Sequence, residues 1–241
     1  MMPPNLNTGD PVMTRTFAMI SLACGLASSA SADITVYSQP TTPNAADVGL
    51  GFYSQSEPRA NRNYKHADDF TLGADASIDR VVWWGQSSGS THDDLTNFDS
   101  FLVEFFSVRL QAGRPVPDAL LGSYTFDPSE TSPTQTGRQT PGGSFEYRHE
   151  ADLPMPFLAS ADTRYFIAIS AGMIQTTSTS DAWQWQDASL VNGESGVYSW
   201  ATRAWSGFQD TDSAFELITV PTPASVVPIM LGALGLSIRR M

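Results

Sequence analysis

Cysteine and positive charge are scarce in this sequence. Its 241 residues include one cysteine, Cys24, so a single copy of the chain can build neither a disulfide framework nor a thiolate metal cluster. Lys65 is the single lysine, and 13 Lys and Arg stand against 25 Asp and Glu, which gives a formal net charge of -12. Binding to a phosphate backbone needs a basic surface, so nucleic acid is not an expected partner.

A helical period is also missing from the body of the chain, residues 33–219. Short segments rich in β-branched and aromatic residues alternate there with clusters of Gly, Pro, Asn, Asp and Ser, which predicts strands joined by turns. The predicted strands are 34–38, 49–54, 67–72, 78–85, 101–110, 120–126, 144–152, 164–171, 182–186, 196–200 and 214–219. The polar stretch 131–143 is expected to be an exposed loop. This pattern predicts an all-β, antiparallel two-sheet sandwich with a jelly-roll-like topology.

The N-terminal segment has the order of a secretory signal peptide. From Met13 a short basic start is followed by an apolar stretch and then by Ala30-Ser31-Ala32, an A-x-A cleavage site directly before Asp33. We therefore expect residues 1–32 to be an N-terminal extension and signal helix that is removed on export. A buried N-terminal helix is the alternative, but the small residues ahead of the cleavage site would give it little to pack with.

The C-terminal segment, residues 220–241, joins a short motif, an uncharged apolar run and a terminal Arg pair. The motif is Val220, Pro221, Thr222, Pro223 and Ala224, and the pair is Arg239 and Arg240. A helix over 224–238 would span about 22 Å, less than the roughly 30 Å of a hydrocarbon core. It is therefore better suited to a transient hold in the membrane than to a permanent span.

This combination resembles the PEP-CTERM sorting signal, with Thr222 at the position where that family usually has Glu. The resemblance implies an exosortase-type membrane protease as a partner and a location at the cell surface or in the extracellular matrix of a Gram-negative-type bacterium. Membrane contact is then expected only through the C-terminal helix, before processing. A simple C-terminal membrane anchor is the alternative.

A second resemblance covers the body of the chain. The residues that carry it are Ala67-Asp68-Asp69-Phe70, Trp84-Gly85, Phe105-Phe106, Gly113-Arg114-Pro115, Tyr165-Phe166-Ile167-Ala168 and Trp183-Gln184-Trp185. They resemble the β-sandwich ectodomains that are common in exported sorting-signal proteins, which are similar to carbohydrate-binding modules in architecture alone. Fold analogy of this kind does not fix a function.

Two tryptophan pairs are the candidate glycan-binding residues. Trp83 and Trp84 are adjacent in a predicted strand, so the pleat sends them to opposite faces, whereas Trp183 and Trp185 share a face. An outward indole beside amides and carboxylates could stack on a sugar ring while the polar groups bind its hydroxyls. The alternative is that all four indoles fill the core.

Oxygen-rich residues in a predicted loop make calcium a candidate ligand. The residues are Asp93, Asp94, Asn97 and Asp99, which together offer carboxylate and amide oxygens of the kind that calcium prefers. The EF-hand spacing is absent, and the alternative is that these side chains form Asx turns or remain solvated.

Signs of catalysis are few. The turn-like string Gly193-Glu194-Ser195-Gly196 lacks the nucleophile-elbow order Gly-x-Ser-x-Gly, and His66, His92 and His149 are too far apart in sequence to form a close zinc-binding pair. Glu104, Glu146 and Glu150 are the candidate acid or base residues on predicted strands. We therefore expect an exported, surface-associated, non-catalytic protein that binds glycan or matrix. A secreted carbohydrate-active enzyme and a purely structural surface protein are the alternatives.

Overall fold

The computed structural model describes residues 32–41, 51–56, 64–88, 98–139, 143–173, 182–188, 194–199, 204–209 and 212–221. Most of these residues lie in strands, and among them a single 3-10 turn spans Pro128–Thr131. The all-β prediction is confirmed. The predicted signal helix and sorting helix lie outside the described residues. Within the described ranges, no helix has the length and apolar character needed to cross a membrane.

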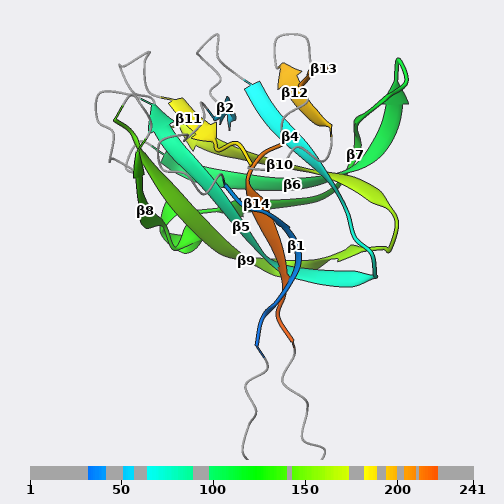
Figure 1. Cartoon of the computed structure of the whole chain (residues 1–241), viewed down its shortest axis with the longest axis horizontal. Coiled ribbons are helices and arrows are strands. Elements are labelled where there is room, and N and C mark those ends of the chain that lie inside the picture. Colours follow the sequence, from blue (N-terminus) through cyan, green and yellow to red (C-terminus); the bar gives the residue numbers. More distant parts are fainter. Residues whose placement is uncertain are drawn as a thin grey trace, which may run out of the picture. The chain divides into compact units, whose positions relative to one another are not determined.

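Two curled sheets of seven strands each form the domain (Figure 1). Sheet I contains β1 (Ile34–Gln39), β2 (Phe52–Tyr53), β5 (Ala76–Ser88), β8 (Thr134–Gln139), β9 (Phe145–Ala159), β11 (Ala182–Trp185) and β14 (Phe215–Thr219). Sheet II contains β3 (Gln55–Ser56), β4 (Tyr64–Thr71), β6 (Phe98–Gln111), β7 (Arg114–Phe126), β10 (Arg164–Met173), β12 (Ser195–Ser199) and β13 (Ala204–Gln209). The described pairings are antiparallel except for a short parallel contact between β3 and β10. This arrangement agrees with the predicted two-sheet sandwich.

Strand β5 organises sheet I. Strand β9 pairs along one of its edges, while the other edge pairs first with β14 and then with β11. Strand β1 pairs with the outer edge of β14, so that Ile34 lies opposite Thr219. The first and last strands therefore leave the domain side by side (Figure 1).

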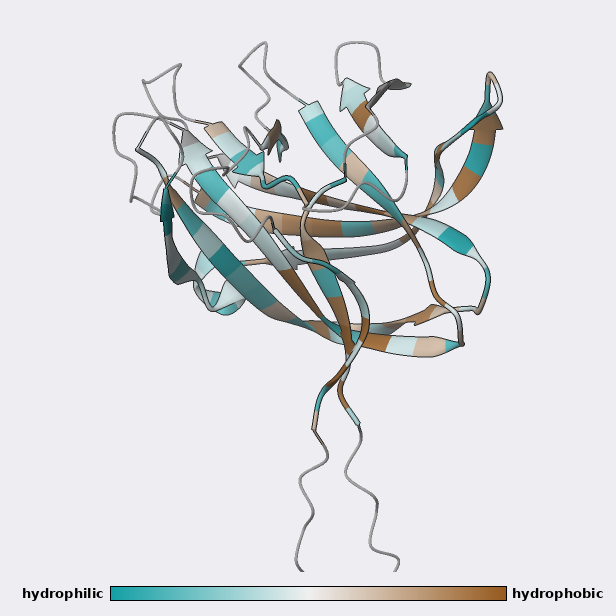
Figure 2. Ribbon diagram, in the orientation of Figure 1, coloured by the Kyte–Doolittle hydropathy of each residue, from teal (hydrophilic) through white to brown (hydrophobic). Residues whose placement is uncertain are grey.

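Alternation along the strands separates core residues from residues on the outer faces. On β10, Tyr165, Ile167 and Ile169 belong to the main core between the sheets. Phe166 and Ala168 point the other way and join a smaller apolar cluster on the outer face of sheet II. In Figure 2, apolar stretches are drawn along the middle of β6, whereas much of β9 is hydrophilic. The period-2 pattern of β10 therefore identifies which of its residues face the core and which face outward.

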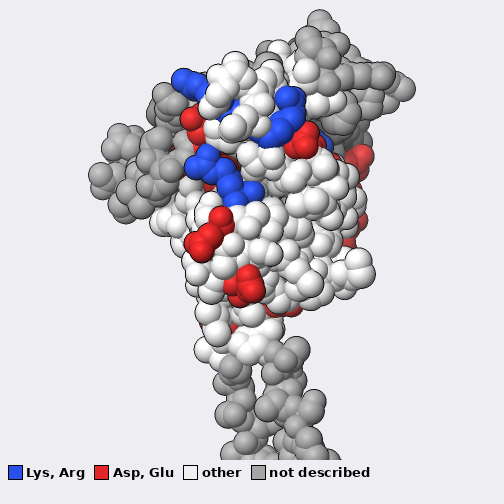
Figure 3. All heavy atoms as spheres, turned by 90° about the vertical axis from the view of Figure 1, so that its right-hand side faces the viewer, with Lys and Arg blue, Asp and Glu red and all other residues white. Residues whose placement is uncertain are grey.

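The small cluster lies where sheet II curls. Phe106 on β6 meets the Trp205 ring on β13 edge to face, with 5.6 Å between the ring centroids. A Cβ atom built on Gly196 would lie 3.6 Å from both Pro117 of β7 and Trp205, so the β6–β7 hairpin packs close to β12. On the side of the domain seen in Figure 3, basic side chains gather in the upper part, and acidic side chains lie among them and below them.

Every predicted strand overlaps a strand of the structure, but three strands, β3, β8 and β13, were missed. The stretch 131–143 is not simply an exposed loop, because β8 lies within it and pairs with β9. Strand β8 reads as a loop because Thr, Gln and Gly137 carry no alternating apolar signal, and one neighbouring strand is enough to hold it at the sheet edge. Strand β13 was missed as well, although Trp205 anchors it in the small cluster.

Candidate functional site

The four candidate tryptophans occupy different environments. Trp83, Trp183 and Trp185 are between 0% and 1% exposed and belong to the main core. The expected sugar platform is corrected at these three positions, because indoles facing the opposite sheet cannot stack on a ligand from solvent. Trp84 is half-buried on the outer face of sheet I, as the pleat requires for the neighbour of a core residue.

Specific contacts hold the three core indoles in place. The Trp183 ring lies directly over Gly85, where an added Cβ would come within 2.5 Å of it. Trp185 Nε1 donates a hydrogen bond to the Ala214 carbonyl at 2.9 Å. The Trp83 ring stacks on the His149 ring with 5.3 Å between centroids. These positions are therefore set by packing, and the remaining candidate for ligand stacking is Trp84.

A row of polar side chains crosses the outer face of sheet I beside Trp84. In register across β2, β11, β5 and β9 the row consists of Tyr53, Gln184, Gln86 and Glu146. Gln86 Nε2 donates to Gln184 Oε1 at 2.7 Å, which links two strands through their side chains. We call these four residues the polar row. Trp84 lies two residues before Gln86 on the same strand face, so indole and polar row are neighbours.

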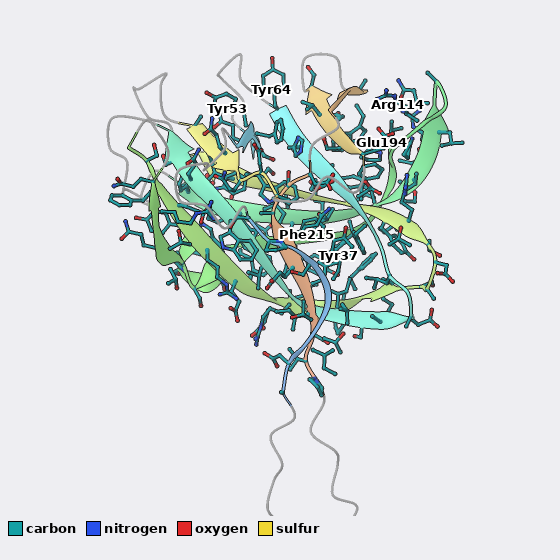
Figure 4. The ribbon with its side chains drawn as sticks, viewed as in Figure 1. Tyr37, Tyr53, Tyr64, Arg114, Glu194 and Phe215 are labelled. Atoms are coloured by element: carbon teal, nitrogen blue, oxygen red, sulfur yellow. The ribbon has the colours of Figure 1, made fainter. Side chains whose placement is uncertain are left out.

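Tyr53 is the exposed member of the polar row. Its side chain is 40% exposed, and Figure 4 places it at the end of the domain opposite the chain ends. Tyr64, which is 38% exposed, lies at the same end but comes from β4 of sheet II. The face around Trp84 therefore has one half-buried indole and one exposed phenol, and the Gln86 and Gln184 amides between them are only 2% and 5% exposed.

Several buried polar atoms of this face have no hydrogen-bond partner within the described part of the chain. They are Gln86 Oε1, Glu146 Oε2 and Arg138 Nε and Nη2. Glu146 Oε1 accepts a hydrogen bond from the Thr136 hydroxyl at 2.9 Å and lies 3.3 Å from Arg138 Nη1. Burial raises the pKa of Glu146, and the contacts with Thr136 and Arg138 partly oppose this effect. The unpaired atoms of Gln86 and Glu146 therefore lie beneath the surface of this face and not on it.

The three candidate acid or base residues are not assembled into a pair. Glu104 lies on sheet II and forms a buried ion pair with Lys65. Glu146 and Glu150 lie on the outer face of sheet I, with the core between them and Glu104. Glu150 is bound by Arg148 at 2.6 Å and by Arg80 at 3.1 Å, so its charge is already matched by basic side chains.

The predicted calcium loop falls mostly outside the described residues. Asp93, Asp94 and Asn97 lie there, as does His92, whereas Asp99 is the second residue of β6. The Asp99 Oδ1 atom accepts a hydrogen bond from the Ser100 hydroxyl at 2.8 Å. Over the described ranges, no three His, Cys, Asp or Glu side chains gather in a metal-binding group. Calcium at Asp93, Asp94, Asn97 and Asp99 stays a prediction.

Two histidines are core residues. His66 stacks on Phe52 with 4.3 Å between ring centroids, and neither of its ring nitrogens has a partner among the described residues. His149 Nδ1 lies 3.1 Å from the Thr131 hydroxyl. Burial lowers the pKa of each imidazole to about 3, so both side chains are neutral in the folded protein.

The buried His66 predicts a loss of stability on acidification. In the unfolded chain its pKa returns to 6.5, so the unfolded state binds a proton at a pH where the folded state does not. The contribution of neutral His66 to the free energy of unfolding is complete above pH 6.5. It falls as the pH drops toward the folded pKa of about 3. Between about pH 8 and pH 5, wild type should lose about 2 kcal/mol more than His66→Phe in urea unfolding. Equal losses would contradict a buried neutral imidazole.

Adjacent Asp68 and Asp69 on β4 connect distant segments, a role that sequence reasoning did not identify. Asp68 Oδ2 accepts from the Ser213 backbone N–H at 2.5 Å, and Asp69 Oδ1 accepts from the Glu194 N–H. Burial, followed by the nearby Asp212, raises the pKa of Asp68 well above its usual range. The signal available in the sequence was two adjacent acidic residues inside a predicted strand, between the apolar Ala67 and Phe70.

Comparison with known proteins places the domain in a family. Residues 35–225 match the family described as "Domain of unknown function (DUF7901)", and the chain belongs to this family. No curated protein matches the chain. A solved CocE/NonD family hydrolase from Staphylococcus aureus shares 9% sequence identity at a TM-score of 0.28, covering 76% of this chain and 36% of the hydrolase chain. This chain thus spans about a third of that protein's length, and so slight a likeness supports no conclusion about activity.

Proposed function

We propose that this protein is an exported, surface-associated bacterial protein whose jelly-roll-like sandwich binds a neutral glycan without cleaving it. Export is supported by the position of the first strand, since β1 begins at Ile34, directly after the cleavage site predicted before Asp33. Sorting by an exosortase-type protease is supported by the last strand, which ends at Thr219, directly before Val220 and the sorting motif. The β-domain thus fits between the two predicted processing sites.

The positions of the chain ends favour a glycan site that faces away from the cell. Because Ile34 pairs with Thr219, an anchor attached to the C-terminus would leave the domain beside the mature N-terminus. Tyr53 lies at the opposite end (Figure 4). A glycan bound beside Tyr53 would then lie on the side remote from the attachment point.

Glycan binding is carried by one observation, the polar row next to Trp84 on the outer face of sheet I. The half-buried indole and the exposed Tyr53 ring offer apolar surfaces for the faces of sugar rings. Beneath these rings the Gln86–Gln184 hydrogen bond joins β5 to β11, and both amides are at most 5% exposed, so they support the site without contacting the glycan. Because Arg and Glu side chains alternate nearby, the face has no dominant charge, which favours a neutral glycan over an anionic one.

We propose that the protein does not cleave the glycan, because its three candidate glutamates are too far apart to act together. A glycosidase needs two carboxyl groups on one site, about 5 to 9.5 Å apart, one of them free to protonate the leaving group. Glu104 faces away from the other two candidates. Glu146 and Glu150 are four residues apart on one strand, roughly 13 Å at about 3.3 Å per residue, and each has an arginine partner.

Binding to a panel of neutral polysaccharides tests this proposal. The protein should be taken from the extracellular or surface fraction, where its intact mass is expected to show a start at Asp33. Wild type should be retained by at least one glycan, and Trp84→Ala should weaken this binding at least about tenfold, about 1.4 kcal/mol. Tyr53→Ala should also weaken it. Tyr64→Ala is the matched control, because it removes an equally exposed ring from the other sheet and should leave binding unchanged.

Each other result contradicts a stated part of the proposal. Release of soluble sugar from a retained polysaccharide would identify a carbohydrate-active enzyme. Retention that Trp84→Ala and Tyr53→Ala leave intact would move the site away from the polar row. Retention by none of the glycans, with no quenching of tryptophan fluorescence, would favour a purely structural surface protein.

A further inference from the structure

Two carboxylates are buried together between the sheets, away from the polar row. Asp68 on β4 is 0% exposed, and Asp212, just before β14, is 1% exposed. Asp68 Oδ1 accepts from the Asp69 N–H at 2.9 Å and its Oδ2 accepts from the Ser213 N–H at 2.5 Å. Among the described residues both of these donors are neutral, and Arg164 binds Asp69 instead, at 3.1 Å. The buried Asp68 carboxylate thus lacks a basic partner in this part of the chain.

Neutral oxygens without partners lie beside these carboxylates. Gln39 Nε2 donates to Asp212 Oδ2 at 3.1 Å, and Oε1 of this amide, which is 1% exposed, has no hydrogen-bond partner among the described residues. Ser213, whose N–H binds Asp68, is fully buried, and its hydroxyl oxygen also lacks a partner in the part of the chain that the structure describes. A buried acceptor without a donor is costly, and each such atom calls for a physical reason.

We propose that Asp68, Asp212, Gln39 and Ser213 bind one calcium ion between the two sheets. The set provides two carboxylates, one amide oxygen and one hydroxyl oxygen, all of them the hard oxygen ligands that calcium prefers. Because the set has only two carboxylates, neutral oxygens and water would complete the six to eight ligands of calcium. Magnesium fits less well, because it demands near-ideal octahedral geometry and gives up its water reluctantly.

The ion would link strands that are distant in sequence. Gln39 comes from β1, Asp68 from β4, and Asp212 with Ser213 from the segment entering β14, so the ligands join sheet I to sheet II. Binding to the folded state alone raises the melting temperature. This site differs from the predicted loop at Asp93, Asp94, Asn97 and Asp99, whose described member, Asp99, is on β6.

Melting of the full chain in calcium and in chelator tests the proposal. Calcium at about 100 times its Kd should raise Tm by about 5 to 10 °C over the chelated protein. Asp68→Asn should lose this shift. In case that variant fails to fold, Ser213→Ala, which removes only one hydroxyl, should melt near wild type in chelator and show a smaller calcium shift. Asp99→Asn is the matched control and should keep the full shift.

Terbium luminescence gives a direct second readout. Trp185 donates its indole N–H to the carbonyl of Ala214, next to Ser213, so tryptophan excitation should sensitise terbium bound here. Calcium should displace the terbium in wild type, and Asp68→Asn should show no sensitised signal. If calcium gave no Tm shift and terbium gave no luminescence, the proposal would be overturned. The result would favour a proton shared between the Asp68 and Asp212 carboxyl groups. An equal shift in Asp68→Asn, or its loss in Asp99→Asn, would overturn it in favour of a site elsewhere.

Discussion

Replacing Trp183 or Trp185 by alanine is expected to lower the free energy of unfolding by about 3 to 5 kcal/mol. Each indole is almost fully buried, and each fills space that no neighbour can occupy without moving. The Trp183 ring lies against Gly85, whose lack of a side chain makes room for it. Trp185→Ala would also remove the 2.9 Å hydrogen bond to the Ala214 carbonyl, which would keep only the longer 3.4 Å bond from the Trp84 N–H. Denaturant unfolding followed by circular dichroism measures both losses.

Trp84→Ala is the matched control for these variants. It removes an identical side chain from the outer face of β5, where the indole is half-buried. The free energy of unfolding should therefore fall by only about 1 to 2 kcal/mol. A loss as large as that of Trp183→Ala would show that Trp84 is a core residue. The proposed glycan face would then retain Tyr53 as its aromatic residue.

Lys65→Ala is expected to destabilise the protein by about 3 to 5 kcal/mol, because it leaves Glu104 buried without its partner. The two side chains are 7% and 10% exposed and lie on the outer face of sheet II beside the small apolar cluster. Replacing both residues at once, Lys65→Met with Glu104→Leu, should be close to neutral, since no uncompensated charge remains. A double-mutant cycle in urea separates the pair from the single losses.

The exposed pair of Arg109 and Asp118 is the control for this cycle. Its atoms are 3.4 Å apart, but both side chains are nearly half exposed, so Arg109→Ala should cost no more than about 1 kcal/mol. Equal losses in Lys65→Ala and Arg109→Ala would mean that burial adds nothing to the Lys65–Glu104 pair. The single lysine of the chain would then have no special structural role.

Local pattern was enough to predict most strands because each strand alternates around a buried face. Residues 164–171 are a different case, because their continuous apolar run predicts a strand that is buried on both faces. Strand β10 is such a strand, with alternate residues in the main core and in the small cluster. Strand β8 escaped prediction because its residues are polar on both faces and its position depends on pairing with β9 alone. A strand whose stability comes from its neighbour carries little signal of its own.

The sequence by itself determined that Trp83 and Trp84 lie on opposite faces, because successive side chains of a strand alternate. It also determined that Trp183 and Trp185 share a face. Only the tertiary structure decided which face is the core, since period 2 is the same whichever side is buried. It likewise decided that Gln86 meets Gln184, 98 residues away, and that Asp68 meets Ser213, 145 residues away. Such contacts arise from strand order and register, which local residue preferences do not encode.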